Sequence, residues 1–215
     1  MLAENITRLR QELGQAQLVV VSKYRSIDEI HAVYNTGQRV FAENRVQALL
    51  ERKEALPNDI EWHLIGHLQT NKVKFIVPFI RCIQSVDSTK LLDEINRQAA
   101  KLNKQIDCLL QVYIAKEETK FGLDVSETEE IIKAYIHGKW PHIIITGLMG
   151  MASNTGNHEQ IKAEFTGLKH LFDELQQNYP NLKFKTLSMG MSSDYPIAIA
   201  CGSNLVRIGS KVFEP

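Results

Sequence analysis

The sequence has 215 residues, of which 44% are hydrophobic and 23% charged, and its 25 basic residues balance its 25 acidic residues. This composition is that of a globular protein and argues against a disordered chain, and the zero net charge provides no overall field toward nucleic acid or an anionic membrane. The length suits one hydrophobic core, so we expect a single domain over residues 1–215, in which any anionic ligand is bound by a local site.

Short apolar runs rich in β-branched residues alternate along the chain with segments of helical spacing, a pattern typical of alternating strands and helices. One additional helix is expected at the N-terminus, where residues 1–14 contain no apolar stretch long enough for a signal peptide or a membrane span. The predicted strands are Leu18–Ser22, Val40–Ala42, Trp62–Ile65, Cys82–Val86, Ile106–Ile114, Ile143–Gly147, Phe184–Leu187 and Leu205–Ile208.

The helix signals and the repeat number together predict a fold. Capping boxes at Ser26–Glu29 and Ser126–Glu129 predict helices that begin at those serines, because the paired side chains satisfy free N–H groups. Eight strand–helix repeats after an N-terminal helix predict an α/β fold, a single (β/α)8 TIM barrel. A doubly wound open sheet is the alternative, but that fold usually has a glycine-rich first turn, which Ser22–Tyr24 lacks.

Lys23 directly follows the first predicted strand, and the carboxyl ends of barrel strands surround the mouth where functional sites are built. Partial burial there would lower the pKa of the lysine and free its amine to attack an aldehyde, which forms a Schiff base. A solvated lysine at the start of a loop is the alternative interpretation.

A phosphate site is predicted after the seventh strand, where Leu187–Tyr195 passes through a glycine-containing turn into a helix with Pro196 in its first turn. The free N–H groups and the dipole at such a helix start favour an anion. An ordinary loop with a serine cap is the alternative.

Arg207 and Gly209 would lie beside that turn in a closed barrel, where the loops after strands seven and eight often bind phosphate. An inward arginine needs an acceptor, because a buried unpaired guanidinium is very costly. A pyridine ring nitrogen is one candidate acceptor, and a structural carboxylate such as Glu43 is the other. Strands one, seven and eight are neighbours in a barrel, so Lys23, the phosphate site and Arg207 converge as pyridoxal 5′-phosphate requires.

Several short blocks of this sequence occur in the order seen in one known family. They are VVSK at 20–23, FAEN at 41–44, VQ at 46–47, EWHLIGHLQ at 61–69, NK at 71–72, SVD at 85–87, KFG at 120–122, GLM at 147–149, LSMGMS at 187–192 and VRIG at 206–209. With these blocks the chain resembles the pyridoxal phosphate homeostasis protein family, small relatives of the alanine racemase N-terminal barrel, over nearly its whole length.

The resemblance implies roles for particular residues. It implies Lys23 as the lysine that holds the cofactor and Arg207 as the neighbour of the pyridine nitrogen. The residues that it implies around the phosphate are Ser188, Met191, Ser192, Gly209 and Ser210.

Two features depart from the family pattern. Residues 41–45 read FAENR where the family usually has FGENY, so Arg45 replaces an aromatic beside the site and access or ligand preference is expected to differ. The chain also ends at Val212–Pro215, short of the tail that similar proteins often carry, and a reduced or missing eighth helix is therefore expected.

Further residues are expected near the cofactor. Asn44 follows the second strand and can both donate and accept, which suits a contact with the ring hydroxyl or a substrate group. Met149, like Met151 and Met191, lies near a strand end, where a soft side chain could line the cofactor or simply fill a gap.

No metal site is predicted. His63 and His67 are four residues apart, as in helical zinc sites, but Trp62–Ile65 is a predicted strand and Gly66 interrupts the run before His67. We expect His63 to be a hydrogen-bonding residue near the mouth, with a satisfied core histidine as the alternative.

These observations favour a carrier of pyridoxal phosphate over an enzyme, with no residue assigned a catalytic role. Arg207 stays protonated, so it can donate a hydrogen bond to the pyridine nitrogen but cannot deliver a proton as an acid would. The racemases of similar fold have a second, β-rich domain and a partner subunit over the site, and this chain has no residues left for either. An amino-acid racemase or related enzyme of weak activity is the alternative, and an interaction module without ligand is the third.

The remaining expectations concern partners and compartment. The partners are pyridoxal phosphate and apo forms of enzymes that depend on it, without nucleic acid or membrane. The three scattered cysteines, Cys82, Cys108 and Cys201, favour free thiols in a reducing compartment. We therefore expect a cytoplasmic monomer.

Overall fold

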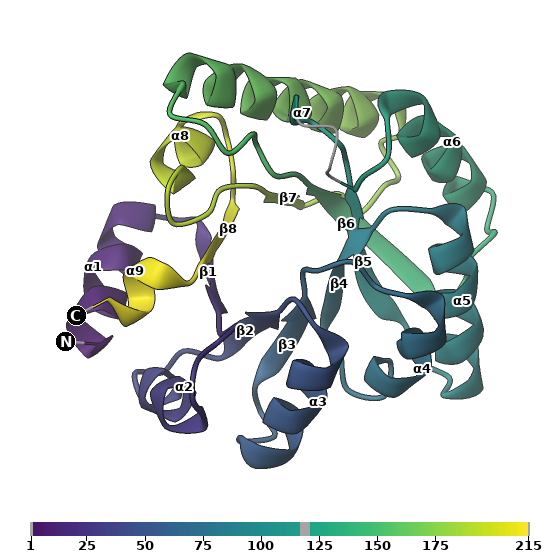
Figure 1. Ribbon diagram of the computed structural model, residues 1–215. Helices are drawn as coiled ribbons and strands as arrows, with labels where there is room; N and C mark the ends of the chain where they lie inside the picture. Colours follow the sequence, from purple (N-terminus) through teal and green to yellow (C-terminus); the bar gives the residue numbers. More distant parts are fainter. Residues whose placement is uncertain (1, 117–120, 215) are drawn as a thin grey trace.

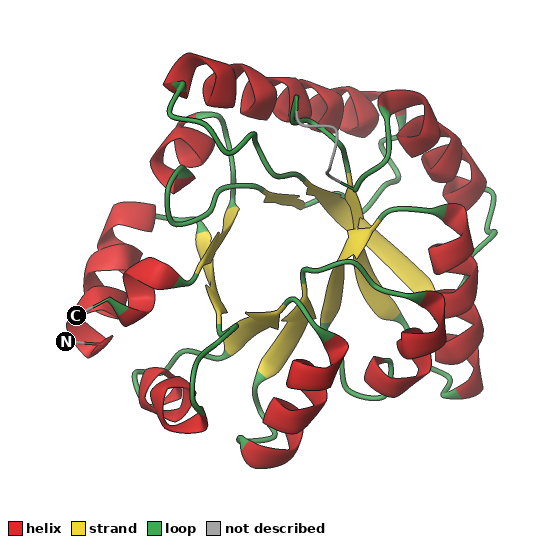
Figure 2. Cartoon of the chain, in the orientation of Figure 1, coloured by secondary structure: helices red, strands yellow, loops and turns green. Residues whose placement is uncertain are grey.

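The computed structural model describes residues 2–116 and 121–214, and in these ranges parallel strands close into a barrel in the order β1-β2-β3-β4-β5-β6-β7-β8. Figures 1 and 2 show the ring of strands surrounded by helices. The closed barrel confirms the (β/α)8 prediction and excludes the open sheet. The strands are β1 Gln17–Val21, β2 Val40–Glu43, β3 Glu61–Leu64, β4 Cys82–Val86, β5 Ile106–Gln111, β6 Ile143–Met149, β7 Thr186–Ser188 and β8 Leu205–Ile208.

The helices lie outside the ring, and each of the first seven crossovers contains one or more helical segments (Figure 1). Their bounds are α1 Leu2–Leu13, α2 Ile27–Tyr34, α3 Val46–Ala55, η1 Thr70–Lys72, α4 Val73–Ile76, α5 Thr89–Lys101, α6 Val125–Ile136, α7 His158–Asn178, α8 Tyr195–Ala200 and α9 Ser210–Phe213. In the described part of the chain, every helix is too short or too polar to cross a lipid bilayer.

The N-terminal helix α1 packs beside the short helix α9, so the two ends of the chain meet on one side of the barrel (Figure 1). The Asn5 side-chain amide donates to the Val212 and Glu214 carbonyls at 3.3 and 2.9 Å, which satisfies groups at the end of α9. As expected, the helix after β8 is reduced, to four residues. Helix α1 therefore covers the outside of the barrel where that helix is short.

Three strand boundaries differ from the prediction by two or more residues, and the other differences are of one residue. β5 ends at Gln111, because the next residues leave the barrel and Tyr113 N donates to the Leu123 carbonyl at 2.9 Å. β6 continues to Met149 and pairs there with Ser188. β7 begins at Thr186, since the ring of Phe184 stacks on Phe172 of α7 with centroids 5.5 Å apart instead of starting the strand.

One capping box was predicted correctly and one was displaced. The side chain of Ser26 accepts from Glu29 N, and Glu29 reciprocates, as expected. The second helix begins at Val125, with Asp124 as its N-cap and Glu127 as the reciprocal partner, so the prediction of a start at Ser126 was wrong. Aspartate caps a helix as well as serine does, and the same spacing two residues upstream gives an equivalent box.

The barrel interior is filled by side chains from alternate strand positions, as expected for strands that are covered on both faces. One interior group contains Val19, Val40, Ala42 and Leu205, with Ile65 against it. A larger layer lies between the barrel and its helices, and Trp62 and Phe165 are among its most buried members. The carboxyl ends of the strands consequently open on one face above a packed interior.

Candidate functional site

A cavity of about 470 Å³ lies at the carboxyl ends of the strands, between the loops that follow β1, β2, β3, β6, β7 and β8. Its volume is within the range of about 300–1,000 Å³ that is usual for small-molecule sites. Its lining residues are Val21, Lys23, Asn44, Ile65, Gly66, Met151, Met191, Ser192, Ser193, Arg207, Gly209 and Ser210. The residues predicted from strands one, seven and eight therefore converge on one mouth.

Lys23 reaches this cavity from a turn that is fixed on both sides. Ser22 N donates to the Ala42 carbonyl at 3.0 Å, and Arg25 N donates to the Ser22 carbonyl at 3.1 Å. Between them Tyr24 adopts a left-handed conformation, with φ of 65°, a rare one for a bulky residue. Lys23 is exposed in the structure, so the partial burial predicted for it was wrong: the turn holds it at the rim and leaves its amine accessible.

Arg207 projects from β8 into the barrel and is 2% exposed. Its Nη1 donates to the Ser188 carbonyl at 2.9 Å and to the Ser188 hydroxyl at 2.5 Å, and its Nη2 donates to the Gly150 carbonyl at 2.9 Å. Burial lowers the pKa of Arg207 to about 10, so the guanidinium stays protonated at neutral pH. Three of its five N–H groups are used by described residues, which leaves two for a ligand.

Glu43, the structural carboxylate considered as the alternative partner of Arg207, pairs with another arginine, so that alternative was wrong. Glu43 lies 2.8 Å from Nε of Arg52, a residue of α3, and accepts from the Ser22 hydroxyl at 2.6 Å. Burial raises the pKa of Glu43, and the bond from Ser22 and the charge of Arg52 oppose that effect. Glu43 thus joins the first two strands to α3 and is not an ion-pair partner of Arg207, and the charge of Asp194 opposes the lowering of the Arg207 pKa by burial.

Ser188 connects Arg207 to a buried network across the barrel. Its hydroxyl donates to Gln84 Oε1 at 2.7 Å, and Gln84 Nε2 lies 2.8 Å from Nδ1 of His63. Burial lowers the pKa of His63 to about 3, so this imidazole is neutral at physiological pH. His63 is consequently a satisfied core histidine, not a residue of the mouth.

Sequence reasoning did not single out Gln84. A polar glutamine in the otherwise apolar strand Cys82–Val86 was the available sign of a buried hydrogen-bonding residue. It comes two positions after Cys82, so both side chains are on the inner face of the barrel.

The loops after β7 and β8 are tied together at the edge of the cavity. Gly209 N donates to the Ser192 hydroxyl at 3.3 Å, and Met191 N donates to Oδ1 of Asp194 at 2.6 Å. Gly190 has φ of 99°, and a Cβ there would lie 2.6 Å from the Ala198 Cβ, so only glycine suits this turn. The predicted glycine-containing turn into a helix is therefore confirmed.

Two predicted residues lie below the cavity and do not line it. Met149 is fully buried with Cys82 and Leu109 in the barrel interior. Ser188 is fully buried and engaged by Arg207 and Gln84. Their places at the mouth are taken by Met151 and Ser193, each further along the loop that follows its strand.

Gly66 brings the loops after β2 and β3 together. A Cβ at Gly66 would lie 2.1 Å from the Asn44 carbonyl oxygen, so a side chain cannot be accommodated without moving the backbone. This contact holds Asn44 at the cavity edge, as predicted for it. In the sequence, the glycine within HLIGHLQ was the available sign of this close backbone approach.

The two histidines considered for zinc have separate surroundings. His63 lies in β3, whereas His67 follows that strand, and its Nδ1 is 2.8 Å from Asp87 Oδ2. The His67 ring also stacks on Phe121, with centroids 4.5 Å apart.

The KFG block at 120–122 includes Lys120, which lies outside the residues that the structure describes.

Comparisons with known proteins agree with this architecture. Residues 1–214 match the family of the alanine racemase N-terminal domain. The pyridoxal phosphate homeostasis protein of Aquifex aeolicus is 40% identical over 199 residues, which cover 92% of this chain and 86% of that protein. PipY of Synechococcus elongatus, solved with pyridoxal phosphate bound, is 35% identical with a TM-score of 0.90, and the match covers 99% of this chain and 100% of PipY.

A more distant likeness shows the shared fold. Alanine racemase of Bartonella henselae, solved with covalently bound pyridoxal phosphate, is 17% identical with a TM-score of 0.75, and the match covers 100% of this chain and 58% of that one. The close relatives, by contrast, match along most of their length. This chain therefore belongs to the pyridoxal phosphate homeostasis protein family, whose barrel is the one shared with the N-terminal domain of alanine racemase.

Proposed function

We propose that this protein binds pyridoxal 5′-phosphate in the mouth cavity, with Lys23 in a Schiff base to the cofactor aldehyde, and supplies the cofactor to apo-enzymes that need it. The observation that carries the proposal is the presence of Lys23, Arg207 and the Ser192–Gly209 junction around one cavity of about 470 Å³. PipY, a relative of 35% identity, was solved with pyridoxal phosphate bound.

The residues of the cavity fit the chemical groups of the cofactor. An exposed amine at Lys23 suits the aldehyde, and the Schiff base forms with release of one water. The two unused N–H groups of Arg207 suit the pyridine nitrogen. Small residues and hydroxyl groups at Ser192, Ser193 and Ser210 suit a phosphate, together with the free N–H groups at the start of α9. We propose that Met191 and Gly209 also contact the phosphate, and that Asn44 contacts the ring hydroxyl or a substrate group.

The close packing of Gly209 supports this arrangement. A Cβ at Gly209 would lie 3.1 Å from the Val21 carbonyl oxygen, so a larger residue would push the phosphate side of the cavity against β1. The glycine leaves backbone exposed where an anion can approach it. Met149 and Ser188 act one layer lower in our proposal, since both are buried beneath the cavity and Ser188 accepts from Arg207.

Arg207 favours a carrier over a catalyst. Pyridoxal phosphate, when bound, supplies an electron sink whose strength depends on protonation of its pyridine nitrogen. A guanidinium whose pKa is about 10 donates a hydrogen bond but does not transfer its proton at neutral pH. The ring is therefore a weaker sink here, and the exposed Lys23 allows an incoming amine to reach and release the cofactor.

The proposal is tested by loading the protein with pyridoxal phosphate, reducing it with borohydride and mapping the modified lysine by mass spectrometry. We expect a yellow protein whose label lies on Lys23. Lys211→Ala is the matched control and should keep the label on Lys23. Lys211 lies in α9, next to the cavity residue Ser210, but does not itself line the cavity. A colourless protein, or a label on another lysine in the wild type, would overturn the proposal.

The proposal also includes the cellular compartment, the oligomeric state and the partners of the protein. The cysteines Cys82, Cys108 and Cys201 are free thiols, which supports a reducing compartment such as the cytoplasm. We propose a monomer that acts on soluble apo-enzymes without nucleic acid or membrane. Size-exclusion chromatography with light scattering at several protein concentrations tests the monomer, and a mass of two chains would contradict it.

A further inference from the structure

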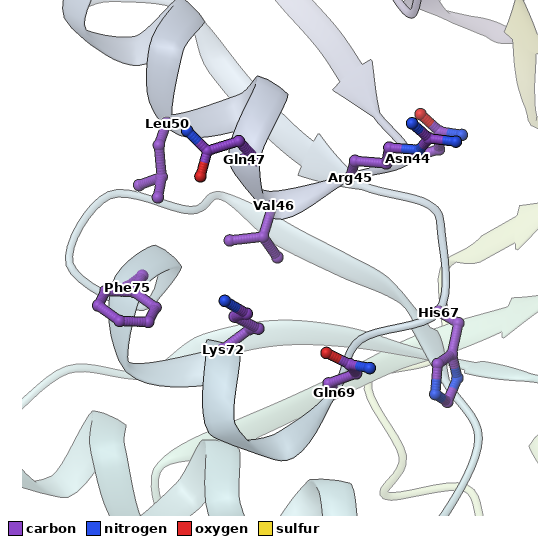
Figure 3. Close-up of a pocket in the computed structure, with 9 residues that line it drawn as sticks. All are labelled: Asn44, Arg45, Val46, Gln47, Leu50, His67, Gln69, Lys72 and Phe75. Atoms are coloured by element: carbon purple, nitrogen blue, oxygen red, sulfur yellow. The ribbon is translucent and has the colours of Figure 1, made fainter.

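A second cavity, of about 390 Å³, lies beside the mouth between α3 and the η1–α4 segment. Figure 3 shows its lining residues, which are Asn44, Arg45, Val46, Gln47, Leu50, His67, Gln69, Lys72 and Phe75. Asn44 is shared with the cofactor cavity, so the two spaces adjoin. Lys23 and Arg207 do not line it, and the function proposed above makes no use of it.

The charges of this second cavity have one sign. Arg45 and Lys72 contribute two cations, and none of its nine described lining residues carries a carboxylate. Neither cation has an ion-pair partner among the residues that the structure describes. Two acids contact lining residues without lining the cavity themselves: Asp87 Oδ2 lies 2.8 Å from Nδ1 of His67, and Glu51 accepts from the Gln47 amide at 3.0 Å.

The cavity also has an apolar end. Phe75 is 44% exposed although it is a large hydrophobic residue, and Leu50 and Val46 face the same space. In Figure 3 Phe75 and Leu50 lie at one end, Arg45 and His67 at the other, and the Lys72 amine points into the space between. A charged group and an apolar body can therefore be accommodated in one ligand.

The backbone at the polar end of the cavity also favours an anion. Arg45 is the N-cap of the ten-residue helix α3 and makes no side-chain capping bond, and the first turn of α3 contains no acidic residue. Its first N–H groups thus lack the usual internal acceptor, and they carry the positive end of the helix dipole. This effect adds to the two cations but is smaller than theirs.

We propose that this second cavity is a binding site for a small organic anion, a carboxylate or a phosphate ester with an aromatic or branched apolar body. The anionic group contacts Arg45 and Lys72, and the apolar body packs on Phe75 and Leu50. Gln47 and Gln69 provide neutral hydrogen-bonding groups between the two ends. The site is independent of the Schiff base at Lys23.

The test uses phenyl phosphate, benzoate and benzamide as probes, titrated into ¹⁵N-labelled protein while amide resonances are followed. Benzoate and phenyl phosphate distinguish the two kinds of anion, and benzamide is the neutral counterpart of benzoate. We expect saturable shifts at Val46, Gln47 and Lys72 with at least one of the anions and much weaker binding of benzamide. Equal binding of benzamide and both anions would overturn the proposal.

Variants then assign the cations. Arg45→Gln combined with Lys72→Gln should weaken binding of the anion about a hundredfold, because each of the two charge-assisted contacts is worth about a factor of ten. Both side chains are exposed, so the fold is expected to persist, and the dispersion of the same spectra checks it. Lys74→Gln is the matched control, since Lys74 lies beside Phe75 on α4 but does not line the cavity.

The Lys23→Ala variant separates this proposal from the cofactor function. It should lose the reducible cofactor and retain the shifts at Val46 and Gln47, because Lys23 does not line the second cavity. Shifts confined to Ser192 and Gly209 would place the probes in the cofactor cavity and overturn the proposal. Unchanged affinity in the double variant would overturn it as well.

Discussion

The Arg207 Nη1 atom donates to both the carbonyl and the hydroxyl of Ser188, at 2.9 and 2.5 Å, and so joins β8 to β7 inside the barrel. The Ser188 hydroxyl donates onward to Gln84, on the far side of the interior. The guanidinium is therefore held by the protein alone, and its position below the mouth does not depend on a ligand. Such preorganisation lowers the cost of binding, because the donor is already ordered and desolvated.

Lys23→Ala should abolish the reducible imine absorption and leave the fold intact. Lys23 is exposed and fixes no neighbouring element, so the free energy of unfolding should change by less than about 0.5 kcal/mol. Absorption spectra of loaded protein and urea unfolding curves measure the two effects. A reducible imine that persists on another lysine would contradict the assignment of Lys23.

Arg207→Ala should weaken cofactor retention by about 1.5–3 kcal/mol, the usual value of a charged hydrogen bond. It should also destabilise the fold by about 1–3 kcal/mol, because the carbonyls of Ser188 and Gly150 lose their buried donor. Equilibrium dialysis and thermal unfolding are the measurements. Arg207→Lys keeps the charge without the planar fork and should recover part of the stability; an alanine variant with wild-type affinity would remove Arg207 from the site.

The loaded protein should show no substantial racemase activity and should reactivate an apo-transaminase. Racemisation usually needs acid–base groups on both faces of the substrate. Among the described residues that line the cavity, Lys23 supplies the single amine and no imidazole, carboxylate or phenol is present. Chiral analysis of alanine and serine after long incubation tests the first part. Turnover at about 1 per second or faster would establish an enzyme instead.

Stability should fall as the pH falls below the ordinary histidine range, because His63 is buried in its neutral form. Its pKa is lowered from 6.5 to about 3 by burial, with a further contribution from the charge of Arg81. The unfolded state therefore binds a proton that the folded state does not, and the stability that His63 contributes is complete above pH 6.5 and is lost between there and about pH 3. In that window the loss from this group is about 1.4 kcal/mol per pH unit.

Urea unfolding at pH 7 and at pH 4.5 measures this dependence. His63→Gln should reduce the difference between the two conditions, since glutamine does not titrate. His158→Gln, at an exposed position at the start of α7, is the control and should retain the wild-type difference. Equal pH dependence in both variants would show that His63 does not govern acid stability.

Gly66→Ala should destabilise the protein by about 1–3 kcal/mol, the cost of forcing atoms into a packed site. The new Cβ would lie 2.1 Å from the Asn44 carbonyl oxygen, so the loops after β2 and β3 would have to separate. Cofactor affinity should fall too, because both residues line the mouth. Gly167→Ala, in the middle of α7 with no atom within 4 Å of its Cβ, should instead stabilise the protein. Thermal unfolding of both variants checks the contrast.

Short-range patterns in the sequence predicted the elements well. The β-branched runs and helical spacings follow from rules of neighbouring residues, so the barrel, the Ser26 capping box and the glycine turn at Gly190 were predictable. Boundaries were less predictable where tertiary contacts compete. Phe184, for example, reads as strand but packs on α7 instead.

The sequence by itself determined the strand–helix order, and with it the convergence of Lys23, Ser192 and Arg207, because the carboxyl ends of parallel strands share one face of a closed barrel. Only the tertiary structure decided which groups accept from Arg207, since Gly150, one of its acceptors, is 57 residues away in the chain and meets it through barrel closure. It also decided how deep each side chain lies. Met149 is the last residue of β6 and Met151 follows it in the next loop, so a separation of two residues places one in the interior and the other at the mouth.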